Sequence, residues 1–397
     1  MSAAGNITKR GKTSWRLKFE GGSRDPKTGR RKTCYETFRG TKREAQVRLG
    51  ELVAAVGGNA YIAPSKITVA EHVRERVKQW AAAYDPSAKT GISPKTAERY
   101  RELIENQIAP RLGDKLLQKI KPADIEAWQT TLRTSGRKDG KGGISTRTIK
   151  HAHRILSKAL DDAVRNDLVA KNVAKIQGAP AVDDDEVQIV AKEQIGDLIS
   201  KLRGRTIYAR AIVALFTGMR RGEVLALRWL NVDLDGKVIR VREALEETRE
   251  HDIQVKAPKT KAGKRDVSLP AIVVDALREH RRQQLELRVA LGAGKLPDDA
   301  LVFPAPLKGG YQSPRAFSKE WADVAESIGM PEVTFQALRH THASQLIDAG
   351  VDIVTISKRL GHASPNITLK VYAHLFRKDD SKASDAINAA LAGLGQA

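Results

Sequence analysis

The stretch Thr217-Gly-Met-Arg-Arg-Gly-Glu-Val-Leu-Ala-Leu-Arg-Trp229 combines a glycine turn, two adjacent arginines and an apolar run. Three further polar stretches follow it, at residues 256–270, 334–344 and 360–374. Together they hold arginine, lysine, histidine and tyrosine side chains, which can bind an anion or move a proton. If these stretches form one site, the fold has to bring together segments that lie far apart in the chain.

The net charge of the chain is strongly positive. Its 397 residues include 69 Lys and Arg against 47 Asp and Glu, a formal net charge of +22. Residues 1–60 alone hold 14 basic and 5 acidic residues, which gives 14 − 5 = +9. Each neutralised phosphate releases condensed counterions, so this excess favours a nucleic acid partner over an anionic membrane surface. A basic surface that only binds water would have the same composition.

Other features exclude several classes of protein. Cys34 is the only cysteine, so an intramolecular disulfide, a zinc finger and an iron–sulfur cluster are excluded. No apolar run approaches the roughly 20 residues that cross a bilayer, and the polar start lacks the apolar segment of a signal peptide. We therefore expect a protein of the reducing cytoplasm (a bacterial nucleoid or host cell cytoplasm) with no membrane partner.

The first segment, residues 1–62, is expected to form a small sheet and one helix. Apolar residues alternate over Ser14–Glu20 and Thr33–Arg39, and a glycine-rich turn connects the two runs, which predicts a β-hairpin. Thr41-Lys-Arg-Glu44 has the spacing of a capping box and predicts a helix to about Val56.

The second segment, residues 67–176, is expected to be helical. Apolar residues from Val69 to Trp80 keep helical spacing, and Ser93-Pro94 places an N-cap before a proline at the first helical position. Further helices are expected over residues 122–133 and 146–166.

The third segment, residues 185–397, follows an acidic linker at residues 179–186. It is expected to begin with helices over residues 192–228 and to end in helices, the last at about 380–394. Three β-rich runs lie between them, at residues 237–246, 252–258 and 264–269. The predicted fold class is mainly α with small β-sheets (α+β), in three domains.

The four polar stretches give the chain a family resemblance. The second stretch reads Lys256-Ala-Pro-Lys-Thr-Lys-Ala-Gly-Lys-Arg-Asp-Val-Ser-Leu-Pro270, and the third Thr334-Phe-Gln-Ala-Leu-Arg-His-Thr-His-Ala-Ser344. The fourth reads Leu360-Gly-His-Ala-Ser-Pro-Asn-Ile-Thr-Leu-Lys-Val-Tyr-Ala-His374. In their order and spacing, over roughly residues 185–378, they resemble the tyrosine recombinase (phage integrase) family. The two preceding segments resemble that family's helical core-binding domain and, more loosely, its arm-binding domain.

The resemblance implies a role for each of five catalytic residues. Arg220 and Arg339 match the family's two catalytic arginines, and Lys259 matches the lysine that protonates the leaving 5′ oxygen. His362 matches the later histidine or tryptophan position, and Tyr372 matches the nucleophile.

The resemblance also concerns residues near these five positions. Glu223 matches an acidic position that supports the site, and we expect it to hold Arg220 in place rather than to take part in the chemistry. The lysine could instead be Lys261, because several lysines crowd the same predicted hairpin. The family usually has His-x-x-Arg where this chain has Gln336-Ala-Leu-Arg339. Glutamine can donate a hydrogen bond to phosphate but cannot carry a proton near neutral pH.

The chemistry of these side chains agrees with the implied roles. A phosphodiester under attack gains negative charge, and guanidinium groups can donate paired hydrogen bonds to its oxygens. A phenol with a pKa near 10 attacks poorly until nearby cations lower that pKa. A phosphotyrosine intermediate conserves the energy of the broken bond, so neither ATP nor a metal cofactor is expected.

Two local expectations concern the helices that carry these residues. Ser364-Pro365 predicts a helix start, with Tyr372 about two turns in and beside a core face formed by Ile367, Val371 and Leu375. His340 and His342, offset by four and six residues from Gln336, are expected to point elsewhere. No metal site is expected from the histidines at positions 340, 342, 362 and 374, since no carboxylate or thiolate has ligand spacing.

The sequence thus predicts an integrase of a phage or mobile element that cleaves and rejoins duplex DNA through a 3′-phosphotyrosine. Two alternatives remain: a type IB topoisomerase-like nicking-closing enzyme, and, because of Gln336, a catalytically inactive DNA-binding regulator. The resemblance implies double-stranded attachment sites, a homotetramer on paired sites and accessory DNA-bending or excision factors from the host. The C-terminal helix is expected to pack either on its own domain or on a neighbouring subunit.

Overall fold

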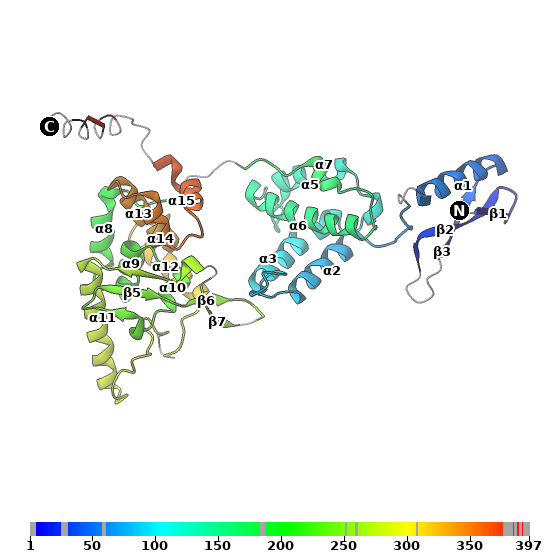
Figure 1. Ribbon diagram of the computed structural model, residues 1–397. Coiled ribbons are helices and arrows are strands. Elements are labelled where there is room, and N and C mark those ends of the chain that lie inside the picture. The colour runs from blue at the N-terminus through cyan, green and yellow to red at the C-terminus, as the bar shows by residue number, and fades with distance from the viewer. Residues whose placement is uncertain are drawn as a thin grey trace. The chain divides into compact units, whose positions relative to one another are not determined.

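The computed structural model describes residues 5–24, 31–57, 61–182, 187–250, 252–258, 261–306 and 309–375, and also residues 384, 387, 388 and 391. The chain divides into two compact units, Met1–Asp183 and Asp184–Ala397 (Figure 1). Helices predominate in both units and the sheets are small and antiparallel, which confirms the expected fold class. The division into three domains stays a prediction.

The first unit begins with a three-stranded sheet of order β1-β2-β3 that packs on one helix (Figure 1). The expected hairpin is present as β2 (Ser14–Arg24) and β3 (Arg31–Arg39), while β1 (Gly5–Lys9) was not expected. Alternation along β2 buries Leu17 and Phe19 against helix α1 (Lys42–Gly57), and the outward-facing residues lie on the other side of the sheet. The N-terminal sheet and α1 thus form a small hydrophobic core that is separate from the core of the helical bundle.

The rest of the first unit is a helical bundle around one apolar core. Its elements are α2 (Val69–Ala82), α3 (Pro94–Leu103), the π turn η1 (Ile104–Ile108), α4 (Ala109–Leu112), the 3-10 turn η2 (Leu117–Lys119), α5 (Pro122–Ser135), α6 (Thr146–Arg165) and α7 (Val173–Gln177). The predicted N-cap of α3 forms, since the Ser93 side chain accepts from the Thr96 backbone N–H. Asp162 of α6 is buried, where it accepts from Arg76 Nε at 2.7 Å and from Trp80 Nε1 at 2.9 Å.

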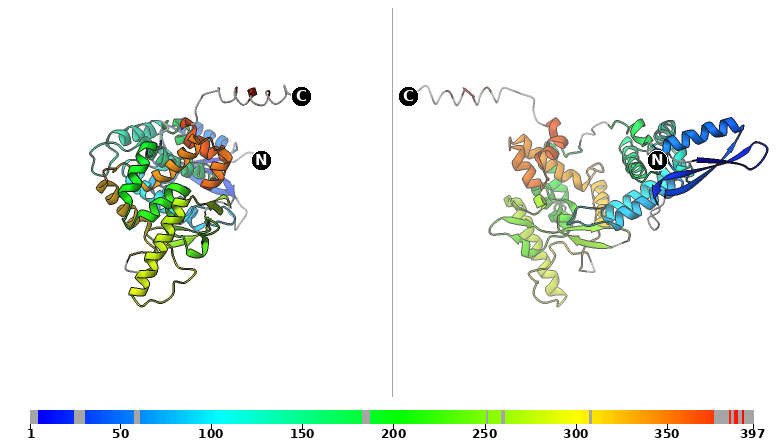
Figure 2. Two further views of the ribbon diagram at one scale, coloured as in Figure 1. Left: turned by 90° about the vertical axis from the view of Figure 1, so that its left-hand side faces the viewer. Right: turned by 45° about the vertical axis from the view of Figure 1, so that its right-hand side comes forward.

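The second unit surrounds helix α9 (Tyr208–Thr217), in which all but a few side chains are buried. The other helices are α8 (Lys192–Leu202), α10 (Arg221–Leu225), α11 (Ala271–Ala290), α12 (Pro314–Ser327), α13 (Phe335–Asp348), α14 (Ile353–Leu360) and α15 (Pro365–Tyr372), with 3-10 turns η3 (Trp229–Asn231), η4 (Lys261–Gly263) and η5 (Ala373–Leu375). Helix α11 runs along one side of the unit and its C-terminal half projects from it (Figure 2). Helix α13 packs against α9, which brings the third polar stretch next to the first.

The β-rich region differs from the expectation. The run at residues 237–246 is divided between β5 (Val238–Val241) and β6 (Ala244–Glu247), which belong to different sheets. One sheet has the order β4-β5-β8, with β4 at Val232–Asp233 and β8 at Arg265–Ser268, and the other pairs β6 with β7 (Ile253–Lys256). The segment between β7 and β8 therefore connects two sheets and is not the tip of a hairpin. Pairing partners far along the chain decide this, and alternation alone does not show them.

The predicted C-terminal helix at about residues 380–394 lies almost wholly outside the described residues. Ile387 and Leu391, which the structure does describe, are exposed. Within the described part of the chain, none of the helices combines the length and apolar character required to cross a membrane.

The contacts of Asp162 generate a stability prediction. Asp162→Ala leaves the Arg76 guanidinium without its buried partner, so the free energy of unfolding of the first unit should fall by about 3–5 kcal/mol. Glu105→Ala is the matched control, since it breaks an exposed pair with Arg74 and should cost about 0–1 kcal/mol. Urea unfolding followed by circular dichroism measures both. Equal losses for the two variants would contradict the prediction.

Candidate active site

Arg339 is buried where three helices of the second unit meet. It lies on α13, which Thr334 caps by accepting from the Ala337 backbone N–H at 3.1 Å. Its guanidinium donates to the Gly218 carbonyl at 2.5 Å and to the Leu360 carbonyl at 2.8 Å. These carbonyls belong to the C-terminal ends of α9 and α14, which carry partial negative charge. Arg339 thus fastens the first, third and fourth polar stretches together.

Gly218 makes this close approach possible. It ends α9 with a φ of 65°, a left-handed conformation that favours glycine. A Cβ atom there would lie 2.7 Å from both His342 Cδ2 and Leu360 Cδ2. Any larger residue would push α13 or α14 away from the end of α9.

Arg220 stands at the mouth of the same site. It is the N-cap of α10, where its backbone N–H donates to Glu223 Oε2 at 2.9 Å. Its guanidinium donates to Glu223 Oε1 at 2.8 Å and to the Gly361 carbonyl at 3.1 Å. The Arg220 side chain is 40% exposed, so its remaining N–H groups can reach a ligand.

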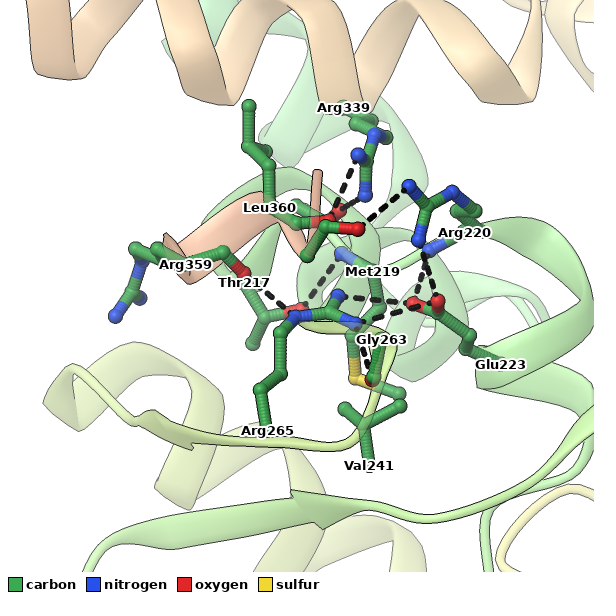
Figure 3. A network of polar contacts seen from close by, with 12 residues as sticks. Thr217, Met219, Arg220, Glu223, Val241, Gly263, Arg265, Arg339, Arg359 and Leu360 are labelled. Atoms are coloured by element: carbon green, nitrogen blue, oxygen red, sulfur yellow. Dashed lines mark hydrogen bonds and ion pairs between the residues drawn. The ribbon is translucent and has the colours of Figure 1, made fainter. Parts of the chain in front are cut away.

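Glu223 is a buried carboxylate shared by two arginines (Figure 3). Besides Arg220 it accepts from Arg265 at 2.9 and 3.2 Å, and Arg265 also donates to the Arg359 carbonyl at 2.6 Å. Burial alone would raise the pKa of Glu223, but the Arg265 hydrogen bond and charge outweigh it and hold this pKa below its usual range. The geometry agrees with a supporting role for Glu223. Arg265, which has no role in the sequence prediction, is the buried partner that the sequence does not reveal.

His362 is held by both ring nitrogens. Nε2 lies 2.9 Å from an Arg339 guanidinium nitrogen, and Nδ1 lies 2.7 Å from Thr368 Oγ1. The guanidinium can only donate, so Nε2 accepts and Nδ1 carries the proton. Burial and the charges of Arg339 and Arg220 lower the pKa of His362 to about 4. The imidazole is therefore neutral at neutral pH.

Tyr372 is the last residue of α15 and its side chain is almost completely buried. Of the predicted core face, Val371 and Leu375 pack against the core, but Ile367 is 43% exposed and is wrong. Tyr372 lies within this core and not beside it, and Thr368 is buried too. Burial raises the pKa of Tyr372 to about 12, although the charges of Arg339 and Arg220 oppose this rise. The phenol is therefore protonated in the unliganded site.

His340 contacts the phenol of Tyr372, with Nδ1 2.7 Å from Oη. The expectation that His340 points away from the site is therefore wrong. At about 100° per residue, an offset of four from Gln336 leaves the two side chains only about 40° apart on α13. This helical spacing is the signal that could have identified His340. His342 does lie elsewhere, where it accepts from Arg359 Nε at 2.9 Å.

These side chains border one cavity of about 530 Å³. Its lining includes Arg220, Gln336, Arg339, His340, His362 and Tyr372. Gln336 is exposed at this cavity, as expected of a residue that meets a ligand. The structure thus brings together four of the five predicted catalytic residues and both predicted supporting residues.

Lys259, the fifth predicted catalytic residue, lies outside the described residues, and so does the side chain of the alternative, Lys261. The described residues on either side, Pro258 and Gly263, both border the cavity. Lys256 lines it too, paired with Glu246. Which lysine acts therefore stays a prediction. Across the part of the chain that the structure describes, no three His, Cys, Asp or Glu side chains cluster in a way that could hold a metal ion.

Two family models match the chain in its own order of segments. The model described as "Phage integrase family" matches residues 188–379, which contain every predicted site residue. The model described as "Phage integrase, N-terminal SAM-like domain" matches residues 74–133. The chain belongs to the phage integrase family. Members of this family are tyrosine recombinases, enzymes that cleave and rejoin DNA.

Relatives and solved structures agree with this membership. A "Tyrosine recombinase XerC-like" protein of Caldanaerobacter subterraneus is 26% identical and covers 98% of this chain and 99% of its own length. The Tn1549 transposon integrase, solved in complex with a circular intermediate DNA, covers 82% of this chain and 99% of its own, with a TM-score of 0.66 and 18% identity. A lambda integrase tetramer bound to a Holliday junction covers 91% and 96%, with a TM-score of 0.54 and 17% identity. At these identities the solved structures support the fold.

The buried carboxylate of this integrase generates a prediction about acid stability. Glu223 has a folded pKa below its ordinary 4.5, so it stabilises the fold above that pH and loses this effect as pH falls through the folded pKa. Glu223→Gln leaves Arg265 without a buried counter-charge and should lower the free energy of unfolding at pH 7 by about 3–5 kcal/mol. The variant should also lose part of the wild-type decline below pH 4.5.

Denaturant unfolding at a series of pH values measures both effects. Asp235→Asn is the matched control, since Asp235 is 99% exposed in its pair with Arg278 and should leave the acid profile unchanged. An acid profile of Glu223→Gln that parallels wild type would contradict the assignment.

Proposed function

We propose that this integrase is a site-specific recombinase of a phage or other mobile element, with Tyr372 as its nucleophile. One observation carries the proposal: the buried Tyr372 phenol borders the same cavity as the Arg220 and Arg339 guanidinium groups. A cavity that combines a nucleophile with two guanidinium groups, both cationic at neutral pH, suits a phosphodiester. The homologues solved on DNA support a duplex substrate.

The proposed cleavage step is an in-line displacement at phosphorus. Tyr372 Oη gives up its proton to a base as it forms a bond to the phosphorus. The bond to the 5′ oxygen breaks, and that oxygen leaves with the electron pair and takes up a proton. Arg220 and Arg339 stabilise the extra negative charge on the non-bridging oxygens. His362, which is neutral, accepts a hydrogen bond from the Arg339 guanidinium and so holds that guanidinium in place. Lys259 is the proposed proton donor for the 5′ oxygen.

Religation reverses these steps. A 5′ hydroxyl attacks the phosphotyrosine, and the phenol leaves. The energy of the phosphodiester is kept in the covalent intermediate, so the proposal includes no nucleotide and no metal cofactor. A strand from a second duplex can supply the hydroxyl, which turns cleavage into recombination.

Recombination of two duplexes requires four cleavages, and we propose that four copies of the chain assemble on paired sites. The lambda integrase tetramer on a Holliday junction supports this assembly by analogy. Ile387 and Leu391 of the C-terminal tail are exposed, which fits a tail that packs on a neighbouring subunit. We also propose that host DNA-bending and excision factors assist the reaction, and that the reaction takes place inside the cell.

Tyr372→Phe tests the nucleophile. Removal of the phenolic oxygen should preserve the fold and DNA binding but abolish the covalent adduct. The probe is a nicked duplex built on the site that the full-length chain selects from a random-sequence pool, and the adduct appears as a slower band in a denaturing gel. The same band from the Phe variant would eliminate Tyr372 as the nucleophile. An adduct without strand exchange would instead favour a nicking-closing enzyme.

Gln336 is proposed to donate its amide hydrogen bond to a non-bridging oxygen. Gln336→Ala should lose about 1.5–3 kcal/mol of transition-state stabilisation, or about 10- to 100-fold in rate. Gln336→His should be tolerated, because imidazole can also donate. Single-turnover cleavage and religation on the nicked duplex measure these rates. Wild-type rates for the Ala variant would make Gln336 a spectator.

The N-terminal sheet is proposed to bind arm-type DNA sites through its face away from α1. Arg16 and Lys18 lie on that face, and the Arg16 guanidinium is 4.1 Å from the ring centroid of Tyr35, which is 52% exposed. Cations and an exposed aromatic ring on one face suit a DNA backbone.

Replacement of Arg16 and Lys18 by alanine should weaken the binding of arm-type DNA. It should also reduce the slope of log affinity against log salt concentration by roughly 2. Core cleavage should be unchanged. Lys42→Ala with Arg43→Ala removes the same charge from α1 and is the matched control. Fluorescence anisotropy over a salt series measures the slopes, and equal slopes for wild type and the Arg16 and Lys18 double variant would contradict the proposal.

A further inference from the structure

The contact between His340 and Tyr372 involves neither the two arginines that bind phosphate nor the leaving 5′ oxygen. His340 Nδ1 lies 2.7 Å from the phenolic oxygen, and the two rings are tilted by 58° with centroids 5.7 Å apart. Tyr372 is only 1% exposed, so bulk water has little access to its hydroxyl. A phenol that attacks phosphorus has to release its proton, and the neighbouring imidazole is positioned to receive it.

The other histidine of the site is less suited to this task. Both ring nitrogens of His362 are engaged, Nε2 with Arg339 and Nδ1 with Thr368. Gln336 lies one helical turn before His340 on the same face of α13, and its amide cannot accept a proton near neutral pH. His340 therefore combines a hydrogen bond to the phenol with a basic nitrogen.

The surroundings keep the His340 imidazole ready to accept. Burial and the charge of Arg339 lower the pKa of His340 below its ordinary value of 6.5, so the ring is neutral at neutral pH. A neutral ring can accept the phenolic hydrogen at Nδ1. Among the described residues, these other titratable groups border the same cavity: Arg220 and Glu223 at the start of α10, Glu246 and Lys256 of the β6–β7 sheet, Arg339 of α13, His362, and Tyr372 of α15.

We propose that His340 is the general base that activates Tyr372. The proposal rests on the proposed function, in which Tyr372 attacks the phosphodiester. As the bond from Oη to phosphorus forms, the phenolic proton passes to Nδ1, and the 5′ oxygen leaves with its electron pair and takes a proton from a different donor. In religation the imidazolium returns its proton to Oη as the phenol leaves.

Proton transfer accompanies attack and does not precede it. The pKa of Tyr372, about 12, lies far above that of His340, so a free phenolate would be too rare to carry the reaction. The phenol therefore loses its proton only while its oxygen bonds to the phosphorus. The arginine charges stabilise the negative charge that the phosphate gains in this step. A base on the nucleophile side and Lys259 on the leaving-group side divide the two proton transfers between two residues.

His340→Gln separates proton transfer from positioning. Glutamine can still hydrogen-bond to the phenol but cannot take its proton, so single-turnover cleavage and religation should both slow by about 10²-fold or more. His340→Asn, a shorter amide, should show the same loss and serves as the second variant. Melting temperature and binding to the selected duplex verify that each variant folds.

A duplex with sulfur in place of the bridging 5′ oxygen distinguishes the two sides of the reaction. A thiolate leaves without protonation, so Lys259→Ala should recover most of its rate on this duplex while His340→Gln stays slow. Cleavage by wild type should also decline as pH falls below the pKa of His340, and His340→Gln should lack that decline.

Cleavage by His340→Gln at the wild-type rate, or recovery on the sulfur duplex as for Lys259→Ala, would overturn the base assignment. Failure of the proposed function has a different signature. In that case wild type itself forms no adduct, or Tyr372→Phe forms one, whatever His340 does.

Discussion

The Glu223 carboxylate is the interaction on which the catalytic unit depends. It is buried and accepts from Arg220 on one side and from Arg265 on the other, so one negative charge compensates two guanidinium groups. Arg265 in turn donates to the Arg359 carbonyl at the end of α14. This hydrogen bond fixes the position of the turn between α14 and α15. Without this carboxylate, the cations Arg220, Arg265 and Arg339 would lie close together with main-chain carbonyls as their partners. Coulomb repulsion would then separate them.

Main-chain dipoles stabilise the buried cation that Glu223 does not contact. Arg339 is buried and, among the residues that the structure describes, pairs with no carboxylate. It donates instead to the Gly218 and Leu360 carbonyls at the ends of α9 and α14. Such carbonyls stabilise a cation but leave the site with a net positive potential. That potential favours an anionic phosphate. Burial lowers the pKa values of His340 and His362, and the nearby arginine charges lower them further, so both imidazoles are neutral.

Several features could be predicted from the sequence because their signals are local. The hairpin of β2 and β3 follows from alternation, the start of α3 from Ser93-Pro94, and the start of α1 from Thr41 and Glu44, whose side chains bond as a capping box. Strand β1 was missed, since its pairing with β2 and not its own pattern makes it a strand. The β-rich run at residues 237–246 is divided between two sheets, because strand pairing and not the local pattern decides where the chain leaves one sheet for another.

The sequence by itself determined the types of residue in the site and their order, because arginine, histidine and tyrosine keep their chemistry wherever the chain places them. The family resemblance also implied that Glu223 supports the site, and in the structure Glu223 accepts from Arg220. Only the tertiary structure decided the partners that lie far apart in the chain: Arg265 beside Glu223, Arg339 on the ends of α9 and α14, and His340 on the phenol of Tyr372. These contacts depend on how whole helices pack, and packing is settled by the complete core and not by any single segment.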